Sequence, residues 1–182
     1  MEEIRLAEPT MAYEDQVMAC KAAFLRSGDD FAGCAGLETA QSYAHWLDFE
    51  GRLSKAYGEG YVPSTVRLGV RAADDRVVGI IDFRHRLNPF LLAFGGNIGY
   101  SVLPSERGKG YAKEMLRQML ALCREEGLDR VLVTCDRENT ASARTILANG
   151  GVLENEVADE AGLGKSGVIR RYWIDLRQED TL

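Results

Sequence analysis

Residues 98–112 constrain the fold more than any other part of this 182-residue chain. An alternating apolar segment, 97–103, is typical of a β-strand, and a loop with Gly108 and Gly110 separates it from an amphipathic helix at 111–126. The start of a helix attracts anions, because its first N–H groups are unpaired and its dipole is positive there. Glycines let a ligand approach the backbone closely. This stretch therefore predicts a strand–loop–helix unit that binds a phosphate-bearing ligand.

Hydrophobic spacing along the rest of the chain predicts a mixed α/β order. A turn signal at 73–75 joins two strands into a hairpin, so the first half of the sheet is expected to be antiparallel. We predict an α/β fold with a mixed, mostly antiparallel sheet of about seven strands, built as a single domain over residues 1–182. The expected helices are 13–25, 39–57, 111–126 and 139–149, and the expected strands are 3–7, 65–72, 76–86, 97–103, 130–134, 152–157 and 168–176.

Composition narrows the classes of partner. The formal net charge of −6 disfavours nucleic acid, because phosphate binding needs clustered basic residues. The same charge favours a cationic partner, although an acidic surface also serves solubility alone. The sequence shows neither a signal peptide nor an apolar run of membrane-spanning length, so we expect a cytoplasmic protein without a membrane partner. Four cysteines without CxxC spacing and only two histidines predict no metal site.

A dinucleotide site is the main alternative for the glycine loop. A Rossmann site requires G-x-G-x-x-G in a parallel βαβ unit and an acidic residue about 20 residues later. Here the third glycine is missing and the preceding strands are expected to be antiparallel. The dinucleotide interpretation is therefore the weaker one.

The loop sequence carries a family resemblance. Residues 107–112, Arg-Gly-Lys-Gly-Tyr-Ala, match the R/Q-x-x-G-x-G/A signature, and the sequence resembles the GNAT acyltransferases along nearly its whole length. Asn139 opens a helix that ends at the glycines of 149–151, where the family has its N…GF segment. More narrowly, the chain looks like a poorly characterised bacterial subgroup of predicted acetyltransferases, through 84–88, 149–156 and 171–174.

The resemblance implies a GNAT fold, with a sheet that splays between strands 4 and 5, and acetyl-CoA as co-substrate. The loop and the first turn of the helix would hold the pyrophosphate, and the strand before them would pair with the pantetheine arm. Asn139 would contact the pantetheine, although asparagine is also a common helix N-cap. The implied cofactor-binding residues are Tyr100, Ser101, Val102, Gly108, Lys109, Gly110, Tyr111, Ala112, Lys113 and Asn139.

The catalytic residues of the family are less well matched. Ile146 stands where the usual proton-donating tyrosine lies, and Thr134 stands where a carboxylate base is frequent. Tyr172, on the last strand, and His85 are the candidates for catalysis. The structural alternatives are an ordinary strand aromatic for Tyr172 and a half-buried histidine for His85. Asp82 is a weaker candidate for a base, against a surface carboxylate, and Cys135 is a weaker candidate for a thiol nucleophile, against a small buried apolar residue. Tyr43 and Trp46 are weaker candidates for aromatic walls of the acceptor site, against core residues.

We therefore predict an acetyl-CoA-dependent N-acetyltransferase in which a primary amine attacks the thioester directly. The amine would belong to a small-molecule or peptide acceptor. Two alternatives remain open: an acyl-CoA sensor without catalysis, and an N-acyltransferase that uses another acyl-CoA donor. The resemblance also leaves a homodimer open.

Overall fold

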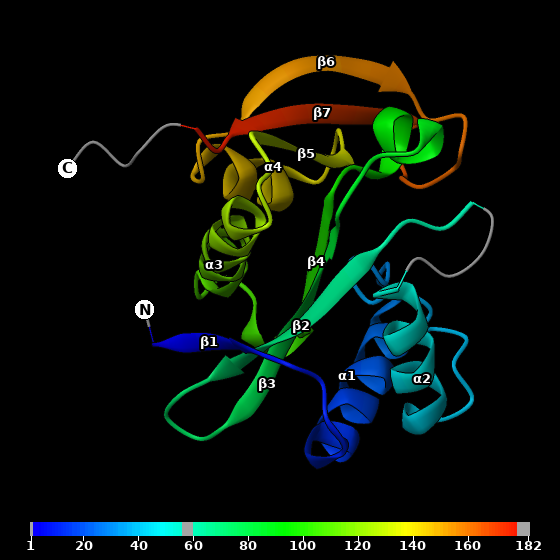
Figure 1. Cartoon of the computed structure of the whole chain (residues 1–182), viewed down its shortest axis with the longest axis vertical. Coiled ribbons are helices and arrows are strands. Elements are labelled where there is room, and N and C mark those ends of the chain that lie inside the picture. The colour runs from blue at the N-terminus through cyan, green and yellow to red at the C-terminus, as the bar shows by residue number, and fades with distance from the viewer. Residues whose placement is uncertain (1, 56–59, 178–182) are drawn as a thin grey trace.

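The computed structural model describes residues 2–55 and 60–177, which form a seven-stranded sheet in the order β1-β2-β3-β4-β5-β7-β6 (Figure 1). Neighbouring strands pair antiparallel, except that β4 and β5 run parallel. The predicted mixed, mostly antiparallel α/β fold is thereby confirmed. The strands are β1 (Ile4–Ala7), β2 (Ser64–Arg71), β3 (Arg76–Arg84), β4 (Ile98–Val102), β5 (Arg130–Asp136), β6 (Val152–Ala158) and β7 (Val168–Asp175).

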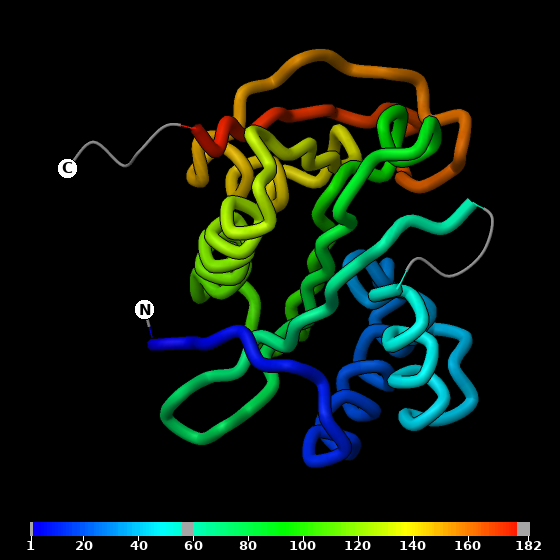
Figure 2. The backbone as a smooth tube through the Cα atoms, viewed as in Figure 1, coloured from blue at the N-terminus to red at the C-terminus, as the bar shows by residue number. Residues whose placement is uncertain are grey.

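Helices cover both faces of the sheet, as the backbone tube in Figure 2 shows. One apolar core lies beneath α1 and α2, and the other lies beneath α3 and α4. The helices are α1 (Glu14–Ser27), α2 (Tyr43–Leu53), α3 (Tyr111–Glu125) and α4 (Thr140–Leu147), with short turns η1 (Met11–Tyr13), η2 (Leu91–Gly95) and η3 (Pro104–Glu106).

The second helix is shorter than the predicted 39–57. It begins at Tyr43 because Ser42 caps it, accepting a hydrogen bond from the backbone N–H of His45 at 3.1 Å. It ends at Leu53, and residues 56–57 of the prediction lie outside the described residues. The segment between α1 and α2, residues 28–42, is irregular and packs against the sheet.

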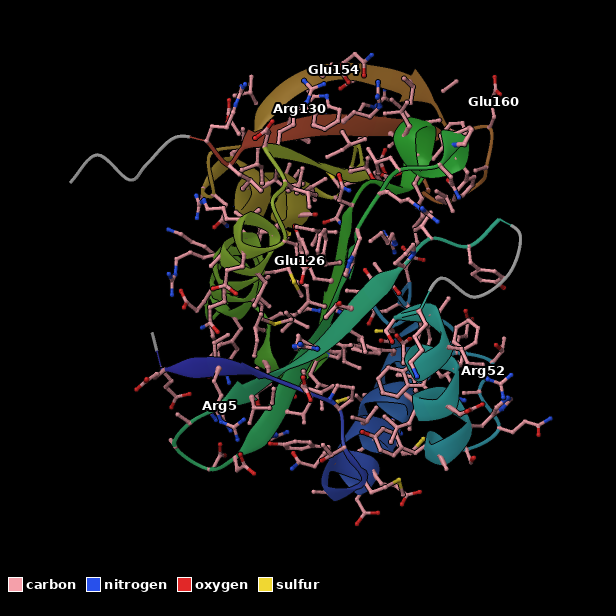
Figure 3. The ribbon with its side chains drawn as sticks, in the orientation of Figure 1. Arg5, Arg52, Glu126, Arg130, Glu154 and Glu160 are labelled. Carbon is pink, nitrogen blue, oxygen red and sulfur yellow. The ribbon has the colours of Figure 1, made fainter. Side chains whose placement is uncertain are left out.

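Packing against small residues holds α3 close to the sheet. The Met115 side chain lies over Gly69 and Gly79, where an added Cβ would approach its sulfur to 2.7 and 2.9 Å. Larger residues on β2 and β3 would therefore push α3 outward. At the other end of the sheet, the Arg130 guanidinium lies 4.1 Å from the centre of the Trp173 ring, which ties β5 to β7 (Figure 3).

Within residues 2–55 and 60–177, no helix has both the length and the apolar character needed to cross a bilayer.

Candidate functional site

The central feature of the site is a splay between β4 and β5. Across the described residues, the two parallel strands pair at one register position, Ile98 opposite Val133. Beyond it, β4 continues to Val102 paired with β3 alone. The main chain of Tyr100 to Val102 therefore has one edge free of a neighbouring strand, which is the geometry that an extended ligand arm needs.

Asn97 closes the splay at its narrow end. Its backbone N–H donates to the Leu132 carbonyl at 2.6 Å, and its side-chain oxygen accepts from the Leu132 N–H at 2.8 Å. The side-chain nitrogen donates to the Arg84 carbonyl at 3.0 Å, so one buried residue joins β3, β4 and β5. The sequence predicted Asn97 as the first residue of a strand, but its side-chain role could not be predicted, because the carbonyl and N–H that it reaches belong to distant segments of the chain.

The N-terminus of α3 is open to a ligand. Its N-cap is Gly110, with φ of 87°, and no side chain among the described residues caps it. Gly108 has φ of 76°, and the position where its Cβ would lie has no described atom within 4 Å. The first N–H groups of α3 thus have no side-chain cap among the described residues, and they lie at the positive end of the helix dipole, as an anion site requires.

The side chains of Arg107 and Lys109 in this loop are half exposed, and each also has a partner in the protein. Arg107 donates to the Val102 carbonyl at 3.1 Å and pairs with Asp29 at 2.8 Å. Lys109 pairs with Glu106 at 2.8 Å. The Tyr111 hydroxyl donates to Glu2 and accepts from Arg71. These contacts fix the shape of the loop, and they leave backbone N–H groups as the means of holding a phosphate.

The α1–α2 segment lies along β4, next to the splay. Ser101 Oγ donates to the Ala32 carbonyl at 2.7 Å, and the Asp29–Arg107 ion pair fixes the start of the segment. Gly33, with φ of 76°, packs directly on the backbone of Gly99. Contact this close is available only to glycine, because a Cβ would meet the main chain of β4.

On the α3 and α4 side, polar groups gather where β4 and β5 diverge. Asn139 caps α4 by accepting the Ser142 N–H at 3.0 Å, so the expected capping role is present. The Tyr100 hydroxyl and Ser142 Oγ are 2.8 Å apart, which links β4 to α4 across the splay. Burial raises the pKa of Tyr100, so this hydroxyl stays neutral. The sequence analysis assigned Tyr100 only a main-chain role, because the distance between β4 and α4 is not visible in the sequence.

Tyr172 lies in the same region. It is buried on β7 opposite Val133, and this burial raises its pKa. Burial raises the pKa of the Cys135 thiol to about 11, so the thiol form prevails at neutral pH. Ile146, at the position of the family tyrosine, is fully buried against Gly151.

The other predicted residues lie elsewhere. His85 Nε2 is 2.8 Å from Thr65 Oγ1, and its ring stacks on Phe83 with centroids 4.6 Å apart. Within the described part of the chain, no hydrogen bond or ring contact joins His85 to β5 or to Tyr172. The Thr134 hydroxyl donates to the Phe94 carbonyl at 2.7 Å.

A cavity of about 540 Å³ opens on the α1–α2 side of the sheet. Of the two residues predicted as acceptor walls, Trp46 lines it, whereas Tyr43 is not among its described lining residues. Asp82 also lines it and is 1% exposed, so it is not the surface carboxylate that the sequence allowed. Burial raises the pKa of Asp82. Arg84 Nη2 lies 3.0 Å from Asp82 Oδ2, and the Gly99 N–H donates to Asp82 Oδ1 at 3.0 Å.

Over the described ranges of the chain, three or more His, Cys, Asp or Glu side chains nowhere gather as metal ligands would.

Comparison with known proteins agrees with this geometry. Residues 64–152, from β2 to the start of β6, match the model described as "Acetyltransferase (GNAT) domain". We found no match among curated proteins. Similar solved structures include a Bordetella pertussis protein assigned to the GNAT acetyltransferases, with 22% identity, 96% of each chain covered and a TM-score of 0.65.

Two further structures contain a coenzyme. The microcin C7 self-immunity acetyltransferase MccE, in complex with acetyl-CoA and AMP, is 17% identical, with a TM-score of 0.67 over 96% of this chain and 93% of that one. RimL, a ribosomal L7/L12 α-N-protein acetyltransferase in complex with CoA, is 16% identical, with a TM-score of 0.70 over 94% and 93%. At these identities the likeness establishes the fold. Residues 64–152 match the GNAT acetyltransferase domain, and the chain has the fold of solved structures that are named as GNAT-family acetyltransferases.

Proposed function

We propose that the protein is an acetyl-CoA-dependent N-acetyltransferase that transfers an acetyl group to a primary amine by direct attack. The observation that carries the proposal is the combination of an uncapped α3 N-terminus with a β4 edge left unpaired beyond Ile98. A diphosphate and an extended pantetheine arm need these two features side by side. Similar folds that bind acetyl-CoA or CoA, one of them acting on a protein α-amine, support the choice of donor and acceptor.

The residues present fit the coenzyme in this arrangement. The backbone N–H groups from Gly108 to Lys113 would hold the pyrophosphate, and the main chain of Tyr100, Ser101 and Val102 would pair with the pantetheine. Asn139 uses its carbonyl oxygen as the α4 cap, so its amide nitrogen is the group that would donate to the ligand. The coenzyme supplies the thioester that activates the acetyl group.

Direct attack fits the thiol chemistry of the site. A covalent acetyl-enzyme would need a Cys135 thiolate, and burial holds the pKa of that thiol at about 11. The leaving thiolate also needs a proton. We assign it to the Tyr172 hydroxyl, because Tyr172 belongs to the same buried cluster as Cys135, on the strand next to β5. His85 remains a predicted base without a contact that supports the role.

The function is tested by acetyl-CoA consumption with polyamines, aminoglycosides, amino acids, aromatic amines and N-terminal peptides. Mass spectrometry of the product should show one added acetyl group on the amine nitrogen. CoA binding without turnover of any amine would favour the non-catalytic sensor, and faster turnover with succinyl-CoA would favour another donor.

Coenzyme A should stabilise the folded protein. At a CoA concentration 100 times its Kd, mass action adds about 2.7 kcal/mol to the free energy of unfolding. For a chain of this length, that corresponds to a rise in Tm of about 5–10 °C. NAD and ATP at the same concentration should raise the Tm less, as thermal unfolding by circular dichroism would show. A larger rise in Tm with NAD would instead favour the dinucleotide interpretation of the glycine loop.

Gly108→Ala should weaken CoA binding about tenfold, because the added Cβ enters space that no described atom fills in the loop proposed to hold the pyrophosphate. Gly127→Ala is the matched control. Gly127 has φ of 81°, follows the other end of α3, and likewise has no described atom within 4 Å of its Cβ position. Each variant should lose about 1 kcal/mol of stability through backbone strain. Calorimetry with CoA tests the difference, and equal affinities for the two variants would refute the pyrophosphate loop.

A further inference from the structure

Arg84 is a charged side chain that a ligand in the cavity beneath α2 can reach. It lines the cavity and is 22% exposed, whereas its ion-pair partner Asp82 is 1% exposed. Glu50, on the buried face of α2, is not among the described lining residues, and both of its oxygens are buried without a described hydrogen-bond partner. Burial raises the pKa of Glu50 to about 8, so this carboxyl group is mostly uncharged at neutral pH. The interior therefore presents a guanidinium to a ligand.

The guanidinium of Arg84 has donors left for a ligand. Among the described residues it donates two hydrogen bonds, both from Nη1, to the carbonyls of Gly95 at 3.1 Å and Gly96 at 3.4 Å. Its Nη2 lies 3.0 Å from Asp82 Oδ2. A guanidinium carries N–H groups on all three nitrogens, so Nε and one N–H of Nη2 remain. A carboxylate suits such donors best, because both partners of the hydrogen bond are then charged.

A ligand on Arg84 lies next to the splay. The backbone carbonyl of Arg84 accepts from the side chain of Asn97, which closes the narrow end of the splay, and its guanidinium contacts the two residues before Asn97. The neighbouring Asp82 accepts the N–H of Gly99, where β4 leaves β5. An amine one carbon away from a carboxylate on Arg84 would therefore face the strand edge assigned to the pantetheine. An α-amino acid has this spacing.

Aromatic side chains form the outer part of the same cavity. Phe49 and Tyr61 meet edge to face with centroids 6.2 Å apart, and Phe90 also lines the cavity. Tyr61 and Phe90 are half exposed, so they stand at the entrance. A flat apolar group packs well among such rings. The volume of about 540 Å³ lies in the usual range for small-molecule sites.

We propose that this cavity binds the acetyl acceptor as a free aromatic α-amino acid, with its carboxylate on Arg84 and its ring at the aromatic entrance. The inference rests on the acetyl transfer proposed above and adds the class of substrate. The zwitterion matches the buried ion pair charge for charge, because its carboxylate faces Arg84 and its ammonium lies in the field of Asp82. A simple amine offers Arg84 no anion, and a polyamine brings a second cation toward it.

The transfer converts the ammonium group of the amino acid into an amide. The nitrogen loses one proton to solvent and forms a bond to the acetyl carbon, and the carbon–sulfur bond breaks. The second proton lost by the nitrogen balances the proton that the leaving thiolate gains. The carboxylate takes no part in these steps. Its contact with Arg84 should therefore act on the KM for the amino acid rather than on kcat.

Calorimetry of CoA-loaded wild-type protein with matched ligands tests the inference. Phenylalanine should bind at least about tenfold more tightly than phenylalaninamide, which keeps the amine and the ring but lacks the carboxylate. 2-Phenylethylamine, which has no group in that position, should bind as weakly as the amide. Alanine should bind at least about tenfold more weakly than phenylalanine, because it lacks the ring.

A double variant, Asp82→Asn with Arg84→Gln, removes both charges of the buried pair and leaves neither unpaired. Its Kd for phenylalanine should rise at least about tenfold, and its Kd for phenylalaninamide should stay within about twofold of the wild type. The matched control is Arg86→Gln, because Arg86 is exposed, lies two residues further along the chain and is not among the described lining residues. It should leave both Kd values within about twofold of the wild type.

The outcomes separate this inference from the function beneath it. Absence of CoA binding in the wild type would refute the acetyl transfer itself. Normal CoA binding with phenylalaninamide bound as tightly as phenylalanine, or with no binding of phenylalanine, would refute the carboxylate contact. Alanine bound as tightly as phenylalanine would refute the aromatic class. A general disturbance of the cavity in the double variant would weaken the amide as well, so a selective loss of phenylalanine affinity is a direct effect at Arg84.

Discussion

Gly33→Ala is expected to lower the free energy of unfolding by about 3–4 kcal/mol, through strain at a positive φ and overpacking. The added Cβ would lie within 2.8 Å of Tyr100 Cα and closer still to the Gly99 carbonyl. These are backbone atoms of β4, so no side chain can rotate away to make room. The φ of 76° at Gly33 adds strain for any residue with a Cβ.

Gly28→Ala is the control for the strain alone. Gly28 ends α1 with φ of 64°, and no described atom lies within 4 Å of its Cβ position. This variant should lose only about 1 kcal/mol. Urea unfolding at equilibrium measures both values. Equal losses of unfolding free energy in the two variants would contradict the close packing of the α1–α2 segment on β4.

The strand–loop–helix unit could be predicted from the sequence because its signals are local. Glycines at positive φ, a proline after the strand and a helical apolar stripe lie within about twenty residues, and each follows from backbone sterics or from periodicity. The hairpin of β2 and β3 and the start of α3 therefore agree with the structure closely. The start of α2 was placed too early, because the cap provided by Ser42 was overlooked among the small residues before it.

The cavity beneath α2 could not be predicted in the same way. It forms between α2, the ends of β2 and β3 and the η2 turn, which approach one another only through the fold. Glu50 resembles an ordinary solvent-facing residue of an amphipathic helix, since charged residues are rarely buried without a partner. Asp82 alternates with Phe83, so a surface position was plausible until the α1–α2 segment was seen to cover that face.

Tyr172→Phe should reduce kcat about 10²–10⁴-fold, the usual effect of losing one proton donor. Burial raises the pKa of Tyr172, so its hydroxyl carries a proton at neutral pH and can give it to the leaving thiolate. The CoA affinity should stay within about twofold of the wild type, because Tyr172 lies on β7 and the proposed coenzyme contacts come from β4, α3 and Asn139. The assay needs saturating acetyl-CoA and the acceptor identified by the screen.

Tyr43→Phe controls for the loss of a buried hydroxyl as such. Tyr43 is fully buried on α2 and donates to the Thr10 carbonyl at 2.9 Å, away from the splay. It should lose about 1 kcal/mol of stability and keep its kcat. If Tyr172→Phe also keeps a kcat within threefold of the wild type, the tyrosine is only part of the apolar core. The hydroxyls of Tyr100 and Ser142, which meet between β4 and α4, would then be the next candidates, and variants of these two residues would be the next to assay. A drop in kcat with unchanged CoA affinity would instead place the proton donor at Tyr172 on β7. That position would replace the tyrosine that the family usually carries on α4, where this chain has Ile146.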